Sequence, residues 1–141
     1  MRTLAVDPGE KHLGLAISDP TGAIANPLTV IKHIARLVDA AAVAQIARDQ
    51  EVGLIVIGEA LDDEGEATTQ SRRAARFAEA VRLQTSLPVV LWDESGSTQT
   101  ARDARIAMGV SRRKRRGHLD DLAATVILQS YLDAHIKEQS R

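Results

Sequence analysis

The order of short apolar segments along the chain is the feature that most constrains its fold. Three strand-like segments come first, at about Thr3–Val6, Leu13–Ser18 and Ile24–Val30. They are joined by tight turns, marked by Pro8–Gly9 and by Asp19–Gly22. Because links this short cannot hold a crossover helix, we expect these strands to be antiparallel neighbours in one sheet.

The rest of the chain alternates between helical and strand-like patterns. A helix is predicted from Ile34 to Gln50, since apolar residues recur there at helical spacing. The recurring apolar residues are Ile34, Leu37, Val38, Ala41, Ala42 and Ile46. The later elements are expected at Leu54–Ile57 (strand), Thr68–Gln84 (helix), Val89–Trp92 (strand), Ser97 or Thr98 to Met108 (helix) and Leu119–Ile136 (helix).

This order places the chain in the α/β class. Right-handed crossovers make the last two strands parallel to the first. We therefore expect a five-stranded mixed sheet, with three antiparallel strands followed by two parallel ones, flanked by helices. A length of 141 residues fits one domain spanning residues 1–141.

Composition narrows the function. The chain has no cysteine, which excludes disulfides and thiolate metal sites. With one Trp, one Tyr and one Phe, it has too few aromatic residues for a surface that binds unpaired bases by stacking. Neither a signal peptide nor an apolar run of membrane-spanning length is present. We expect a cytoplasmic protein without membrane contact, either a monomer or a weak homodimer.

One concentrated basic run stands out against a net charge of −1. It comprises Arg112, Arg113, Lys114, Arg115 and Arg116. We expect a mobile loop between two helices that holds a nucleic-acid backbone by its phosphates. The alternative is a solvated, solubilising connection, as charge runs usually are.

Acidic residues recur where the parallel strands are predicted to end, which is where ligands gather in open α/β sheets. The acids in question are Asp7, Glu59, Asp93, Glu94, and the pair Asp120 and Asp121 at the start of the last predicted helix. Clustered carboxylates favour Mg²⁺ or Mn²⁺, and two such ions suit phosphodiester hydrolysis. Taken singly, each acid also has a structural explanation, such as a turn at Asp7 or a helix N-terminus at Asp120.

Three segments in a fixed order resemble the motifs of one family. They are DPGEKHLGLAISDPTGAIANPL at Asp7 to Leu28, LPVVLWDE at Leu87 to Glu94, and SRRKRRGHLDDLAATVILQSYLD at Ser111 to Asp133. These segments resemble the YqgF/RuvX group of RNase H-like nucleases, described as Holliday junction resolvases and as pre-16S rRNA nucleases. The resemblance runs nearly end to end and implies a ribonuclease H-like fold.

The resemblance also implies a site. The family's catalytic and metal-binding acids correspond to Asp7, Glu94 and Asp120, and Asp93 matches the acid that flanks one of them. Lys11 matches the lysine of the first motif and is expected, with the basic run, to contact nucleic acid. The family's usual Arg after Asp-Glu is replaced by Ser95, and Glu59 stands where related resolvases carry a catalytic acid. Glu59 is therefore an additional candidate ligand.

Several functions are compatible with these residues. The first is a metal-dependent nuclease that processes the 5′ end of precursor 16S rRNA, with a Holliday junction endonuclease acting on branched DNA as its alternative. A second class is a non-catalytic RNA-binding module on the same fold, favoured by the missing Arg. A third, an actin-like or sugar-kinase-like ATPase, is disfavoured because no second D-x-G hairpin exists to enclose ATP.

Overall fold

The computed structural model describes residues 1–93 and 112–139, and the side chains of residues 1–93 and 122–135 among them. The helix predicted near 97–108 lies outside the described residues. The observed elements are β1 (Thr3–Pro8), β2 (His12–Ser18), β3 (Ala25–Lys32), α1 (Arg36–Asp49), β4 (Leu54–Glu59), α2 (Thr69–Arg82), β5 (Val89–Asp93) and α4 (Arg112–Gln139).

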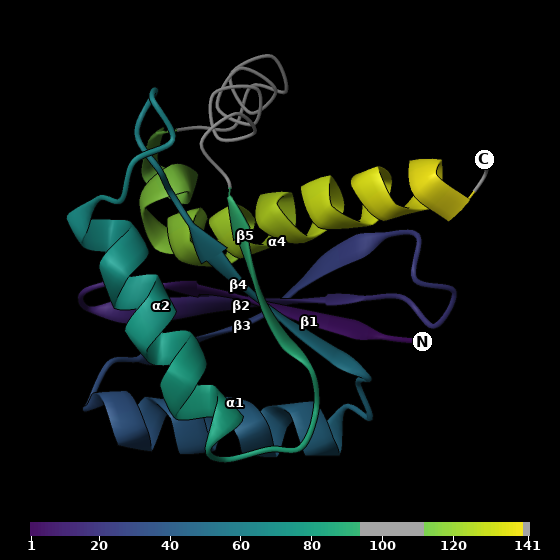
Figure 1. The fold of residues 1–141 in the computed structure, drawn as a ribbon, viewed down its shortest axis with the longest axis horizontal. Coiled ribbons are helices and arrows are strands. Elements are labelled where there is room, and N and C mark those ends of the chain that lie inside the picture. Colours follow the sequence, from purple (N-terminus) through teal and green to yellow (C-terminus); the bar gives the residue numbers. More distant parts are fainter. Residues whose placement is uncertain (94–111, 140–141) are drawn as a thin grey trace.

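The sheet has five strands in the order β3-β2-β1-β4-β5 (Figure 1). β1 pairs antiparallel with β2, and β2 pairs antiparallel with β3. β4 pairs parallel with β1, and β5 pairs parallel with β4. The predicted mixed sheet is therefore confirmed, and β1 is its central strand.

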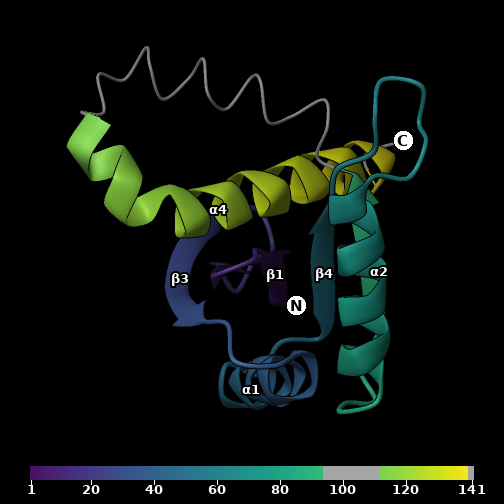
Figure 2. The same ribbon diagram turned by 90° about the vertical axis from the view of Figure 1, so that its left-hand side faces the viewer.

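Each face of the sheet is covered by helices, which explains why β1 is apolar on both sides. Leu4 and Val6 pack into a core shared with α1 and α2, whereas Ala5 packs into a second core under α4. All three side chains are fully buried. Figure 2 shows the resulting layers, with α4 above the sheet and α1 below it. This strict alternation fixes which face each later residue of β1 occupies.

The predicted first helix is observed as α1, but most of the apolar residues whose spacing predicts it do not lie on its buried face. Ile34, Leu37 and Val38 are mostly exposed, and the inward stripe is instead formed by Ala40, Val43, Ala44 and Ala47. Both stripes have helical spacing, so periodicity alone could not choose between them. The choice follows from Asp39, which is buried against the His33 ring and accepts the Ile34 backbone N–H at 3.0 Å. This contact fixes the rotation of the first turn.

The inner face of α2 follows the prediction. Ala74, Phe77, Ala78 and Val81 are all buried. The helix begins after Thr68, whose hydroxyl accepts the Ser71 backbone N–H at 3.0 Å while the Ser71 hydroxyl accepts that of Thr68 at 2.7 Å. This reciprocal pair is a capping box, and it sets where α2 starts relative to the end of β4.

The expectation of a loop at Arg112–Arg116 is wrong, because α4 already begins at Arg112. The run contains neither glycine nor proline, and Arg and Lys are strong helix formers. Asp120 and Asp121 consequently lie inside α4 and not in its first turn. Further along, Gln129 accepts the Ala25 backbone N–H at 2.9 Å and so ties α4 to the edge strand β3. No helix in the described ranges has the length and apolarity to cross a bilayer.

At Gly58 of β4, α4 packs tightly against the sheet. A Cβ placed there would lie 2.5 Å from Cδ1 of Ile127, a fully buried side chain. Gly58→Ala should therefore destabilise the protein by about 1–3 kcal/mol, as overpacking of a core does.

Chemical denaturation of four proteins tests this contact: wild type, Gly58→Ala, Ile127→Val and the double variant. Ile127→Val removes the clashing Cδ1 atom, so the double variant should recover most of the stability lost in Gly58→Ala. If the losses in free energy of unfolding of the two single variants simply add in the double variant, the contact with Ile127 is not what excludes a side chain at position 58.

Candidate active site

The acids that the structure describes at the carboxyl edge of the sheet lie on three adjacent parallel strands. Asp7 is the penultimate residue of β1, Glu59 is the last residue of β4, and Asp93 is the last residue of β5. The strand ends that carry these three acids therefore lie side by side at one edge of the sheet. The faces on which these acids lie are different, however.

Asp7 belongs to the α4 face. It follows Val6, which packs toward α1 and α2, and the pleat therefore turns Asp7 to the opposite side. On β2, the residue paired with Asp7 is Gly14. On β4, Gly58 follows Ile57, the residue paired with Val6, and so lies beside Asp7. Since neither neighbour carries a side chain, the half-buried carboxylate of Asp7 is flanked by glycines in its row of the sheet.

Glu59 and Asp93 form a separate pair. They are register partners on β4 and β5, so their side chains share a face, and the pleat places that face opposite Asp7. Burial, together with the negative charge of Asp93, raises the pKa of Glu59 above its ordinary value of 4.5. The strand ends therefore hold like charges near one another on the α2 side.

The segment after β4 is held by α2. The Ala60 backbone N–H donates to Oε1 of Gln70 at 2.6 Å, and the Thr68 hydroxyl donates to the Ala60 carbonyl at 2.6 Å. The Leu61 backbone N–H lies 3.4 Å from Oδ1 of Asp93. These contacts hold the backbone just after Glu59 against the start of α2 and beside the end of β5.

The other predicted residues are placed as follows. Glu94 lies outside the described residues. The basic run Arg112–Arg116 and Asp120 lie on the α4 backbone, and Lys11 is exposed in the turn between β1 and β2. Within the described part of the chain, no three His, Asp or Glu side chains come together as a metal site.

The spacing along α4 relates position 120 to the site. Ala124 and Ile127 are buried against the sheet, and position 120 precedes them by four and seven residues. Positions separated in this way share one face of a helix. Ile127 is also the residue that meets Gly58, the neighbour of Asp7 across the ladder.

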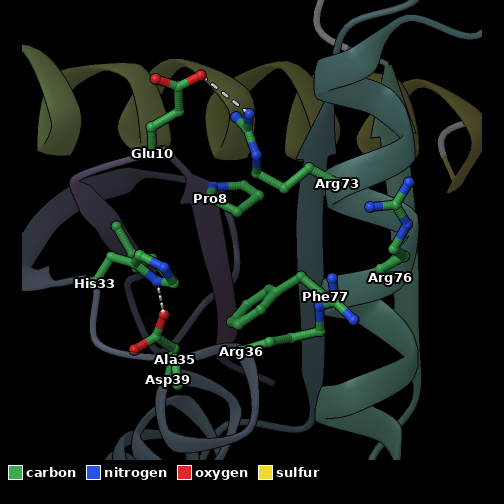
Figure 3. Close-up of a pocket in the computed structure, with 11 residues that line it drawn as sticks. Pro8, Glu10, His33, Ala35, Arg36, Asp39, Arg73, Arg76 and Phe77 are labelled. Carbon is green, nitrogen blue, oxygen red and sulfur yellow. Dashed lines mark hydrogen bonds and ion pairs between the residues drawn. The ribbon is translucent and has the colours of Figure 1, made fainter.

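A basic cavity on the other face of the sheet was not predicted from the sequence. It has a volume of about 340 Å³ and lies between α1, α2 and the β1–β2 turn (Figure 3). Three arginines line it: Arg36, Arg73 and Arg76. The spacing of Arg73 and Arg76 on one helix was the available signal, whereas Arg36 is brought to them only by the fold.

Comparison with known proteins shows one consistent family. Residues 1–134 match the model of the family described as RuvX, Holliday junction resolvase. A relative from Geobacillus kaustophilus is 43% identical over 95% of this chain and 99% of its own length. A relative from Syntrophus aciditrophicus is 40% identical over 99% of this chain and 93% of its own. Both are named "Putative pre-16S rRNA nuclease".

Solved structures share the fold at lower sequence identity. RuvC of Thermus thermophilus, in complex with a Holliday junction substrate, superposes with a TM-score of 0.59 at 20% identity and 96% coverage of both chains. The fowlpox virus Holliday junction resolvase gives a TM-score of 0.55 at 19% identity, covering 95% of this chain and 99% of its own. The RNase H-like fold implied by the sequence is therefore confirmed.

The raised pKa of Glu59 makes a prediction about stability. Its neutral form is favoured by the fold, so the stability present below pH 4.5 should be partly lost as pH rises through the higher pKa of the folded state. Glu59→Gln keeps a neutral side chain at every pH. It should therefore raise the free energy of unfolding at pH 7 and have little effect below pH 4.

Urea denaturation of wild type and Glu59→Gln at several pH values provides the measurement. Asp93→Asn serves as a companion variant, since removing that charge should lower the pKa of Glu59. A pH-independent difference between Glu59→Gln and wild type would contradict the assignment.

Proposed function

Because this chain belongs to the RuvX family, we propose that it is a metal-dependent nuclease that hydrolyses phosphodiester bonds of precursor 16S rRNA. The family assignment and the names of its relatives support hydrolysis of a nucleic-acid backbone as the reaction class. We expect a protein with this substrate to act in the cytoplasm.

The position of Asp7 carries this proposal. It stands near the carboxyl end of the central strand, on the face that α4 covers, and glycines occupy the neighbouring positions on both adjoining strands. A carboxylate at this position lies near the carboxyl edge of the sheet, where ligands of open α/β sheets bind. Position 120 lies on the helical face that packs against this part of the sheet, which favours Asp120 as a partner of Asp7.

The donor set fits a hard divalent cation. Asp7, Glu94 and Asp120 would supply oxygen ligands, which suit Mg²⁺ or Mn²⁺. When bound, such ions stabilise the charge that develops on the attacking and leaving oxygens. Glu59 and Asp93 lie at the same edge but on the opposite face of the sheet from Asp7, so Glu59 would be an additional ligand only for a cation bound on the α2 side.

Phosphate contacts would position the substrate. Arg112–Arg116, in the first turns of α4, and the exposed Lys11 are the proposed sources of positive charge. Contacts of this kind hold a backbone in place without reading its sequence. A branched DNA junction presents the same phosphates, and the family description favours it as the second candidate substrate.

The first test removes the charge of Asp7. Asp7→Asn keeps the shape of the side chain but weakens its binding to a cation, and we expect cleavage to fall by at least about 100-fold. Circular dichroism and thermal melting should show an intact fold. Asp62→Asn, in the exposed loop after β4, is the control and should retain activity. Full activity in Asp7→Asn would exclude Asp7 as a ligand.

The second test compares substrates. A fragment spanning the 5′ end of precursor 16S rRNA and a four-way DNA junction are incubated separately with the protein in Mg²⁺ and in Mn²⁺. We expect metal-dependent cleavage of the RNA fragment to dominate, and chelation by EDTA to abolish it. Junction resolution without RNA cleavage would identify the second candidate, and no cleavage of either would indicate a binding module.

A further inference from the structure

The basic cavity between α1 and α2 has the properties of a phosphate site separate from Asp7. Pro8, Gly9 and Glu10, which directly follow Asp7, form one wall, while α1 and α2 supply the others. Gly9 keeps this wall compact, since a Cβ there would lie 2.4 Å from the His12 carbonyl oxygen. The cavity thus opens beside the same turn that ends the central strand.

Two of its cations are uncompensated. Arg73 is paired with Glu10 at 3.1 Å, and the buried Asp39 is held by His33. Within the part of the chain that the structure describes, Arg36 and Arg76 have no hydrogen-bond or ion-pair partner. In Figure 3, Arg36 extends from α1 toward α2, where Arg73 and Arg76 lie on successive turns. The two acids of the cavity are therefore engaged, and two guanidinium groups remain available.

We propose that this cavity binds a backbone phosphate of the nucleic acid, with Arg36 and Arg76 as its principal ligands. Guanidinium groups donate paired, charge-assisted hydrogen bonds that match phosphate oxygens. The inference rests on the proposed function only for the nature of the ligand.

The placement of the cavity suggests how a strand would lie. Asp7 is on the α4 face of β1, whereas Pro8 belongs to the wall of the cavity on the α1–α2 side. A strand whose scissile phosphate lies at Asp7 can cross the edge of the sheet over the β1–β2 turn. A neighbouring phosphate then enters the cavity, and the exposed Lys11 lies in the turn between them. The cavity would hold the flank of the substrate and not the reacting bond.

The experiment compares two double variants by binding in EDTA, where no cleavage occurs. Arg36→Gln/Arg76→Gln removes the cavity cations. Arg48→Gln/Arg72→Gln removes one exposed arginine from each of the same two helices, outside the cavity. The probe is a fluorescein-labelled hairpin from the 5′ end of precursor 16S rRNA, followed by anisotropy between 50 and 300 mM KCl. Thermal melting checks that both variants fold.

We expect the cavity variant to bind about tenfold more weakly at the lowest salt and its control to stay within about twofold of wild type. Each neutralised phosphate contributes about 0.7–0.9 to the slope of log K against log salt, so loss of this one phosphate contact should flatten the slope by roughly 0.7–0.9. Equal losses in both variants, or no loss in either, would overturn the proposal.

A second experiment tests whether the occupant of the cavity is a backbone phosphate of a nucleic acid or a free phosphate. Inorganic phosphate and adenosine monophosphate are titrated into wild type and the cavity variant by calorimetry. Binding of these small anions that requires Arg36 and Arg76, with RNA affinity unchanged in the variant, would overturn a backbone as the occupant. A protein that cleaves neither substrate but shows arginine-dependent RNA binding would refute the nuclease function and leave this inference standing.

Discussion

The contact between α4 and the end of β4 is the constraint on which the rest of the site depends. Gly58 lets Ile127 pack directly on the sheet beside the strand that carries Asp7. A bulkier residue at position 58 would push apart the two elements from which the proposed ligands come. The absence of a side chain at Gly58 therefore matters both for the packing of α4 and for the position of the proposed ligands.

Charged groups lie on both faces of the sheet at this edge. Asp7 lies on the α4 face, while the Glu59–Asp93 pair and the cavity with Arg36 and Arg76 lie on the face of α1 and α2. Acidic groups thus gather at the strand ends, and positive charge flanks them. The acids at the strand ends repel a polyanion unless a cation neutralises them, and the arginines of the cavity attract it. This arrangement is expected of a nuclease that uses metal ions.

Most of the fold could be predicted from the sequence because its determinants are local. Short links force the antiparallel strands, and β-branched runs mark the buried parallel strands. The failures share a cause. The rotation of α1 depends on the contact between Asp39 and His33, and the cavity depends on Arg36 meeting α2, so both arise from tertiary contacts that periodicity does not contain. The basic run is helical because Arg and Lys are strong helix formers, whereas its charge pattern alone suggests a solvated loop.

The alternation of β1 has a consequence for how this protein can change over evolution. Asp7 and Pro8 are consecutive residues, yet they belong to opposite faces of the sheet. An insertion or deletion of one residue in β1 would exchange the two faces and bury the carboxylate among apolar side chains. The exposed loop at 62–67 faces no such restriction, because its length does not set the register of any strand. Variation in length should therefore accumulate there, while β1 changes only by substitution.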